Sequence, residues 1–474
     1  MSGFSSEYRD SIITEKIAQS ERLIAFGELL IEIQNLEGCL QNHGLADKLP
    51  ALLQGCPEVV GLYRSAIGDT QNSDLNEALD NTVSSDSYDP LEKLLTLVGL
   101  EMTYLRNAPL DLSGAEFNLT YFLRTFNKLL AGSDQLANET TQQILEIIYV
   151  SPISNKGMLG QATLKQLGYI DGLRVETICG DQVSNVSLTA LPPEEKTAKP
   201  GEEKDASKDA LYKRLNGLMR DALDPKVNSE TIDQVTRLIK PNSLFYVSQI
   251  PMSLVRNFDH FLAFITEIKG AGATLIYDTN YRTSLMGEKC FGKYHEKPIP
   301  HYFEQLLPHI DFLSAGIEDL KDMYPDRFKD FNHKHEDRLK NIEVIDGKSV
   351  EMCALFRKEG FQGHVEIKGG ACGTFWQNSQ GDIEHTDTPN PMDKPLDVTG
   401  GGDSNLSTKI MIMRLLGKSS LSADEIILTA NKFANVMSET VVNTLGAQPA
   451  ADVLAPVWHD IVDQVEQVIG SSRD

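Results

Sequence analysis

Short apolar runs and longer segments of mixed polarity alternate along the second half of the chain. The runs are typical of buried strands and occur at residues 244–247, 274–277, 311–314 and 364–367. The longer segments at residues 254–268 and 350–358 are predicted as helices. Strands that alternate with helices indicate a parallel sheet with helices on both faces, so the pattern predicts an α/β fold.

The first half of the chain is less regular. Residues 23–32 are predicted as an apolar strand, so that the core begins near Arg22. A helix is predicted from Pro90, because apolar residues follow it at helical spacing and proline favours a first helical position. The Asp-, Asn- and Ser-rich residues 69–87 predict a solvated loop. Residues 192–209 offer almost nothing to bury and are predicted as a disordered linker.

The composition argues against several classes of protein, among them nucleic-acid-binding and membrane proteins. The chain of 474 residues carries 68 acidic and 44 basic residues, a formal charge of −24, which argues against binding nucleic acid or an anionic membrane. No stretch approaches the roughly 18 apolar residues of a membrane span. The 6 cysteines lie far apart without a C-x-x-C spacing, so neither a disulfide framework nor a zinc site is indicated, and a reducing cytoplasm is expected.

The two ends of the chain are predicted as additions to one core. Residues 5–19 mix charged and apolar positions and are expected to form an amphipathic helix within an N-terminal extension, residues 1–21. The core is predicted at residues 22–450, followed by a C-terminal helix at residues 451–474.

The segment Asp397-Val398-Thr399-Gly400-Gly401-Gly402-Asp403 carries the chief candidate chemistry. Glycines before a helix let backbone N–H groups close around an anion, and the positive end of the helix dipole favours the same ligand. Asp403 can take a proton from an attacking hydroxyl group, so the segment suits phosphoryl transfer. Taken alone, it also fits a flexible turn in which Asp403 is a helix N-cap.

Four motifs in order resemble the ribokinase-like carbohydrate kinases, the PfkB family. The segment ending at Asp403 resembles the family signature, and Lys368-Gly369-Gly370-Ala371-Cys372-Gly373 resembles its glycine turn beside the nucleotide. Asp278-Thr279-Asn280-Tyr281-Arg282 resembles D-x-N-x-R, and Gly114-Ala115-Glu116-Phe117-Asn118 resembles G-A-E-x-N. The resemblance implies a three-layer α/β/α sandwich with a mostly parallel sheet and a small lid, and it makes residues 37–102 a partly helical insertion.

The resemblance also implies roles for individual residues, with ATP and Mg²⁺ as cofactors and a loop for a monovalent cation such as K⁺. Asp403 is the implied base, assisted by the N–H groups of Gly400, Gly401 and Gly402. The implied nucleotide and cation residues are Lys368, Gly370, Gly373, Thr399, Asn431, Ala434 and Gly446. The implied acceptor residues are Glu32, Gly114, Glu116, Asn118, Asn280 and Arg282, and Glu318 is the implied metal ligand.

The acceptor is the least defined part of this interpretation. Glu116, Asn118 and Arg282 look most similar to the 2-keto-3-deoxygluconate kinases, which implies a sugar or sugar-acid substrate. Glu32 stands where relatives have Asp, Ala315 replaces an amide in the metal motif, and Ser404-Asn405 replaces an aromatic and small residues. A nucleoside kinase of the same fold and a non-catalytic scaffold therefore remain alternatives. Relatives often form homodimers through the lid, a contact that the insertion could replace or block.

Overall fold

The structure is a computed structural model that describes most of the chain. The described residues are 13–27, 29–33, 36–48, 56–85, 90–106, 111–131, 144–151, 158–177, 187–190, 225–254, 257–281, 297–329, 331, 338–391, 395–396, 398, 400–417, 419–444 and 447–471. The predicted N-terminal helix is helical at residues 13–18. The predicted linker at residues 192–209 lies outside the described residues.

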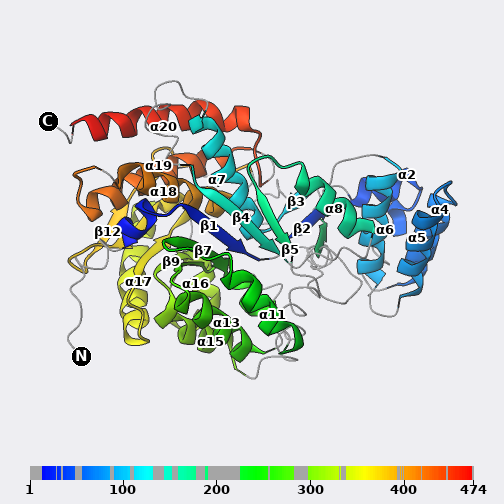
Figure 1. Cartoon of the computed structure of the whole chain (residues 1–474), viewed down its shortest axis with the longest axis horizontal. Coiled ribbons are helices and arrows are strands. Elements are labelled where there is room, and N and C mark those ends of the chain that lie inside the picture. Colours follow the sequence, from blue (N-terminus) through cyan, green and yellow to red (C-terminus); the bar gives the residue numbers. More distant parts are fainter. Residues whose placement is uncertain are drawn as a thin grey trace.

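A nine-stranded sheet forms the centre of the molecule (Figure 1). In spatial order its strands are β12 (Ile383–Thr386), β11 (Thr374–Gln377), β10 (His364–Lys368), β9 (Phe312–Gly316), β8 (Thr274–Asp278), β7 (Ser243–Ser248), β1 (Arg22–Phe26), β4 (Glu146–Ser151) and β5 (Arg174–Thr177). The seven strands from β10 to β5 pair in parallel, and β11 and β12 add an antiparallel edge. The carboxyl ends of the parallel strands therefore share one edge, where ligands bind in such sheets.

Helices cover both faces of this sheet, which gives three layers (Figure 1). On one side of it lie α7 (Ala115–Ala131), α18 (Gly401–Leu416) and α19 (Ala423–Val442), and α20 (Ala451–Ser471) packs against these three helices. The other packs against α11 (Pro225–Thr236), α13 (Phe258–Gly270), α15 (Ile299–Leu306), α16 (Ile317–Met323) and α17 (Arg338–Lys358). The predicted α/β class and the three-layer sandwich are confirmed.

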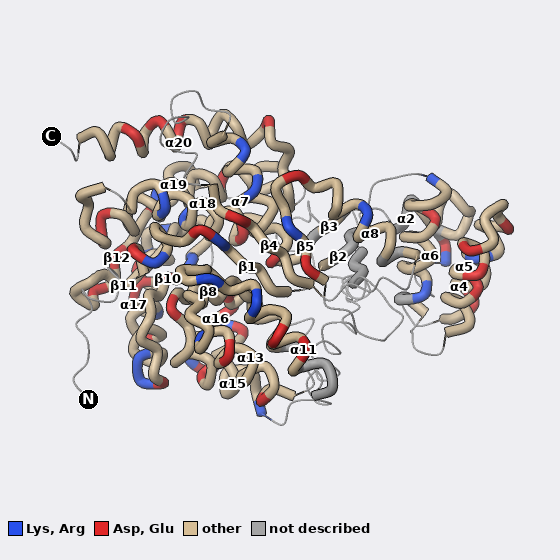
Figure 2. Tube along the Cα trace, in the orientation of Figure 1, with Lys and Arg blue, Asp and Glu red and all other residues tan. Residues whose placement is uncertain are grey.

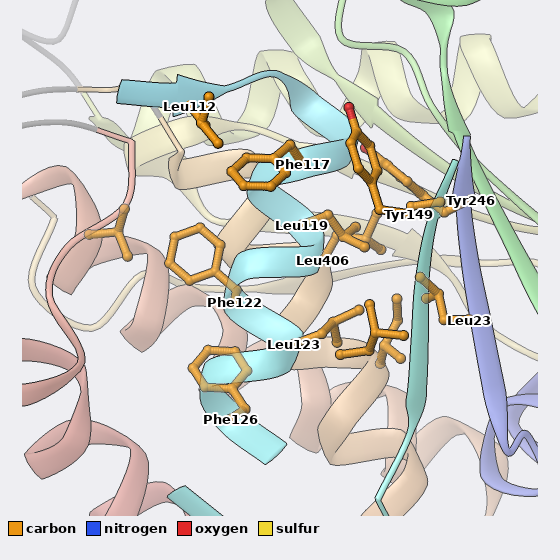
Figure 3. Close-up of a cluster of buried hydrophobic side chains, with 14 of the residues drawn as sticks. Leu23, Leu112, Phe117, Leu119, Phe122, Leu123, Phe126, Tyr149, Tyr246 and Leu406 are labelled. Carbon is orange, nitrogen blue, oxygen red and sulfur yellow. The ribbon is translucent and has the colours of Figure 1, made fainter. Parts of the chain in front are cut away.

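The strands supply both cores because successive side chains point to opposite faces. In β1, Leu23 and Ala25 belong to one hydrophobic cluster, whereas Ile24 and Phe26 belong to the other. Figure 3 shows the first cluster, in which apolar side chains of α7 such as Phe122 lie against the neighbouring helices and the sheet.

Helix α18 is surrounded by protein. Every one of its residues except Gly402 is buried, including several polar ones. Lys409 and Glu366 of β10 form an ion pair of 2.5 Å with both side chains 0% exposed. Burial lowers the pKa of Lys409 to about 8, although the carboxylate of Glu366 acts in the opposite direction. A buried helix of this kind is fixed by complementary partners on every side.

A three-stranded sheet of order β3-β2-β6 forms the small lid: β3 (Asp111–Ser113), β2 (Leu30–Ile33) and β6 (Ser187–Ala190). The expected single strand at residues 23–32 is therefore two strands, β1 in the main sheet and β2 in the lid. The chain leaves the main sheet after Phe26, and this break divides the apolar run between two sheets.

The insertion between β2 and β3 is a helical unit at one end of the molecule (Figure 1). Its helices are α2 (Leu36–Asn42), α4 (Glu58–Ile67), α5 (Ser73–Ser84) and α6 (Pro90–Tyr104). The helix predicted from Pro90 is confirmed as α6. The solvated loop predicted at residues 69–87 is wrong, because most of it is α5, which Asn72 caps by accepting from the N–H groups of Asp74 and Leu75. Figure 2 shows acidic residues along α5, on a helix that buries Leu75 and Leu79.

A buried carboxylate, that of Glu101, links several segments of the insertion by hydrogen bonds. Glu101 of α6 is buried and accepts hydrogen bonds from Tyr63 Oη at 2.6 Å and from Arg106 Nη2 at 2.6 Å, and it pairs with His43 Nε2 at 3.0 Å. Burial by itself raises the pKa of Glu101, but these hydrogen bonds outweigh it and lower the pKa overall. The insertion thus has its own polar centre, which favours one arrangement of its helices.

None of the described helices combines the length and hydrophobicity that a membrane crossing requires.

The buried pair between α18 and β10 leads to a stability prediction. Lys409→Met leaves Glu366 buried without its cation, so we expect the free energy of unfolding to fall by about 3–5 kcal/mol. The double variant Lys409→Met/Glu366→Leu should recover most of this loss, because it removes both charges of the pair and leaves neither unpaired. Arg327→Met, which breaks an exposed pair with Glu351, is the control and should cost at most about 1 kcal/mol. Chemical denaturation of the four proteins measures these differences, and equal losses in the single and double variants would contradict the prediction.

Candidate active site

The first turn of α18 lies at the carboxyl edge of the main sheet and depends on close packing. Its N-cap, Gly400, has φ 80°, and a Cβ atom there would lie 2.3 Å from the carbonyl oxygen of Ala447. A Cβ atom on Gly401 would lie 2.8 Å from a methyl group of Val442. Gly400 is therefore required by its backbone conformation, and both Gly400 and Gly401 are required because a side chain would not fit.

Asp403, in this first turn, is 9% exposed and lies against α7. Its Oδ2 accepts a hydrogen bond of 3.1 Å from Nδ2 of Asn118. A carboxylate in the first turn of a helix is stabilised by the helix dipole and by the hydrogen bond from an amide. The structure thus brings together Asp403 and Asn118, which lie 285 residues apart in the sequence.

Glu116, two residues before Asn118 on α7, has a different environment. Its side chain is 0% exposed, and Oε1 accepts a hydrogen bond of 2.9 Å from the backbone N–H of Ser248 at the end of β7. Its carboxyl group fills the space beside Gly27, where a Cβ atom would lie 2.0 Å from Cδ. Glu116 therefore ties α7 to the ends of β1 and β7.

Lys368 is the last residue of β10, at the same edge. Its Nζ lies 2.9 Å from Oδ1 of Asp278, the last residue of β8, and 3.5 Å from the position that a Cβ atom on Gly402 would take. Burial lowers the pKa of Lys368, but the carboxylates of Asp278 and Glu366 outweigh this effect and raise the pKa overall. A protonated ammonium group thus lies beside the N-terminus of α18.

A cavity of about 320 Å³ opens next to these groups. Its floor includes the glycine turn, in which Gly369 N–H donates to the Gly373 carbonyl at 2.7 Å. Gly373 has φ 87°, and a Cβ atom there would lie 2.2 Å from the carbonyl oxygen of Thr386. The cavity is lined by Lys368, Gly370, Ala371, Gly373, Thr374, Thr388, Pro395, Val398, Gly401, Gly402, Asn405, Asn435, Ser438, Glu439 and Val442.

Helix α19 forms one wall of this cavity. The wall consists of Asn435, Ser438, Glu439 and Val442, which share one helical face. Asn435 connects the wall to its surroundings, since it accepts from Thr374 Oγ1 at 2.9 Å. The sequence interpretation missed this polar face, although the spacing of its members is visible in the sequence.

Asn431 and Ala434, which the resemblance assigns to the nucleotide, lie on α19 before the residues of the cavity wall. Both are 0% exposed, and neither is among the residues that line the cavity. Burial by tertiary packing separates these two positions from the cavity wall, a distinction that the motif pattern does not contain.

The remaining predicted residues are more scattered. Gly114 has φ 118° and its carbonyl accepts from the N–H of Asn118 at 2.8 Å, so it begins α7. Asn280 follows β8 with φ 25°. Glu318, in the first turn of α16, is exposed and lies 3.1 Å from Lys321. Outside the described residues lie Arg282, Thr399 and Gly446, and also the side chain of Glu32 in β2.

Among the described residues, no three His, Cys, Asp or Glu side chains form a group that could hold a metal ion. Asp278 and Gln448 are further members of the site that the sequence interpretation left without a role. Asp278 was visible as the first residue of D-x-N-x-R, whereas Gln448 belongs to no motif. Its Nε2 donates to Oδ1 of Asn118 at 2.9 Å.

Comparison with known proteins supports the architecture. No protein-family model matches the sequence, and no curated protein matches it. A fructokinase from Vibrio cholerae O395, solved with fructose, ADP and a calcium ion, is 13% identical with a TM-score of 0.51, and the match covers 92% of this chain and 96% of the fructokinase. A ribokinase from Giardia lamblia is 11% identical with a TM-score of 0.50, and the match covers 94% of this chain and 99% of the ribokinase. The protein therefore has the ribokinase-like fold.

The N-cap of α18 leads to a second prediction. In Gly400→Ala the added methyl group meets the Ala447 carbonyl and the backbone is strained at positive φ, so we expect the free energy of unfolding to fall by about 1–3 kcal/mol. The matched control is Gly347→Ala in α17, where nothing lies within 4 Å of the added atom. It should raise stability by about 0.5–1 kcal/mol, because alanine favours a helix interior. Thermal and urea denaturation measure both, and similar changes in the two variants would argue against a special role of Gly400.

Proposed function

We propose that this protein is an ATP-dependent kinase that transfers the γ-phosphoryl group to a hydroxyl group of a small acceptor. The observation that carries the proposal is the first turn of α18: it bears the buried carboxylate of Asp403, its residues Gly401 and Gly402 line the cavity of about 320 Å³, and a Cβ atom on Gly402 would lie 3.5 Å from Nζ of Lys368. Phosphoryl transfer requires a base, a stabilised phosphoryl group and exact positioning, and these groups can supply all three.

In this proposal the cavity holds the nucleotide. Apart from the polar side chains of α19, most of its exposed lining is apolar, as suits a base, and Gly401 and Gly402 at the start of α18 are among its lining residues. The N–H groups of a helix N-terminus and its dipole favour phosphate oxygens. The glycines leave these N–H groups open to the ligand, so the phosphates would lie between α18 and Lys368.

Asp403 then acts on the acceptor. Its carboxylate accepts the proton of the attacking hydroxyl group, while the hydrogen bond from Asn118 orients Oδ2. Lys368 faces the same helix start, and its raised pKa keeps it protonated, so it can stabilise the negative charge on the phosphoryl group. Asp278 holds the ammonium group in this place.

The donor set also fits the cations that the resemblance implies. Mg²⁺ takes one or two protein carboxylates and completes its shell with phosphate oxygens and water, and the exposed carboxylate of Glu318 would be such a ligand. When bound, Mg²⁺ neutralises charge on the phosphates. Backbone carbonyl groups suit K⁺, and that of Ala447 lies beside Gly400.

We propose a sugar or sugar acid, of the 2-keto-3-deoxygluconate type, as the acceptor. The support comes from the two acceptor-side motifs. Gly114, of the first motif, begins α7, and Asn280, of the second, follows β8 at the same edge of the sheet as Asp403. The lid strand β3 runs directly into Gly114 and pairs with β2, so the lid would cover a bound acceptor. Glu116 is fully buried and supports α7, so we assign acceptor recognition to its neighbours rather than to its carboxylate.

The base is tested by ADP release from ATP and Mg²⁺ with a panel of sugars, keto-sugar acids and nucleosides. We expect turnover on a sugar or sugar acid, and a loss of about 10²- to 10⁴-fold in kcat in Asp403→Asn. Asp463→Asn, an exposed change on α20, is the matched control and should retain full activity. Turnover on a nucleoside would correct the acceptor class. Nucleotide binding without turnover on any acceptor would instead favour a scaffold.

Lys368 gives a separate test. In Lys368→Met the phosphoryl group loses its nearest cation, so we expect kcat to fall by about 10²- to 10³-fold. Lys432→Met, an exposed change on α19, is the control. Circular dichroism should accompany the assay, because the variant leaves Asp278 without its partner. A folded Lys368→Met protein with normal kcat would refute the role.

A further inference from the structure

A short hydrogen-bond chain leads from the lid to Asp403. The side-chain nitrogen of Gln448, Nε2, donates to the backbone carbonyl of Leu112 in β3 at 2.7 Å and to Oδ1 of Asn118 at 2.9 Å. Nδ2 of Asn118 in turn donates to Oδ2 of Asp403 at 3.1 Å. Asn118 is 4% exposed and Gln448 is half-buried, so protein surrounds much of this chain.

The direction of these hydrogen bonds has a chemical reason. Asn118 can present either its carbonyl oxygen or its amino group to Asp403, and the carbonyl oxygen would repel the carboxylate. The donor on Gln448 meets the carbonyl oxygen of Asn118, which leaves the amino group to face Asp403. Without Gln448, Oδ1 of Asn118 has no donor that favours one orientation of the amide over the other.

The backbone around Gln448 is held on both sides. The preceding residue, Ala447, packs against Gly400, where no Cβ atom would fit. The carbonyl of the following residue, Pro449, accepts a hydrogen bond of 2.6 Å from Tyr121 of α7. The side chain of Gln448 is therefore delivered from a fixed position, as a preorganised site requires.

We propose that Gln448 is a positioning residue, which orients the amide of Asn118 and through it the carboxylate of Asp403, and which links this orientation to lid strand β3. The inference rests on the proposed function in treating Asp403 as the base. Because the carbonyl of Leu112 belongs to the lid, the donor of Gln448 reaches both acceptors only when β3 lies in the position seen here. The orientation of the base thus depends on the position of the lid.

The first test is kinetic. Gln448→Leu keeps the size of the side chain and removes both donors, and we expect kcat to fall about tenfold, the effect of one hydrogen bond, with an unchanged KM for the nucleotide. Gln464→Leu, an exposed change on α20, should have no effect. In an Asn118→Ala background, Gln448→Leu should change kcat by less than about twofold, because its intermediary is gone. Additive losses, or a changed nucleotide KM, would overturn the proposal. Gln448→Glu, which replaces a donor by an acceptor, repeats the test if the leucine variant is unfolded.

The second test does not depend on turnover. The side-chain amide resonance of Asn118 is assigned by its loss in Asn118→Ala, and its shift on Asp403→Asn reports the contact between the two residues. We expect Gln448→Leu to abolish that shift, and a shift of the same size in the Gln448→Leu background would overturn the proposal. Absence of turnover in the unmodified protein would count against the proposed function, whereas the amide resonance would still decide the role of Gln448.

Discussion

The burial of α18 is the constraint on which the rest of the structure depends. The helix lies between the main sheet, α7 and α19, with every residue except Gly402 buried, so its polar side chains must find partners inside the protein. Lys409 finds Glu366 of β10, and Asn405 donates to Asn435 of α19 at 3.2 Å. These contacts fix the rotation and depth of the helix. They thereby fix the position of Asp403, which a freely placed helix would not hold against Asn118.

The same constraint explains why the site is built from distant segments. Parallel strands end at one edge, so Asp278 at the end of β8 and Lys368 at the end of β10 meet there although they lie 90 residues apart. The glycines at the start of α18 allow the helix to approach Ala447 and Val442 closely. Because the insertion joins the chain at the lid, between β2 and β3, it leaves this edge unchanged. The fold can therefore accept a helical unit that has its own polar centre without a change at the candidate base.

The sequence interpretation succeeded where one local cause decides the structure. Pro90 starts α6 because proline suits a first helical turn, and buried strands such as β7 have nearly continuous apolar side chains. It failed at α5, whose Asp, Asn and Ser residues favour a loop in isolation. There Leu75 and Leu79 bury one face against neighbouring helices, and Asn72 caps the N-terminus. Tertiary packing outweighed a weak local preference.

By itself, the sequence determined the α/β class, the glycine-rich start of α18 and Asp403 as the candidate base, because strand periodicity, backbone freedom and charge are local properties. Only the tertiary structure decided which partners these residues have. It buries Asn431 while Asn435 lines the cavity, makes Glu116 a support for α7, and brings Gln448 to Asn118 across 330 residues. Such contacts depend on how helices pack onto the sheet, and no spacing within the chain encodes a distance between segments that meet only after folding.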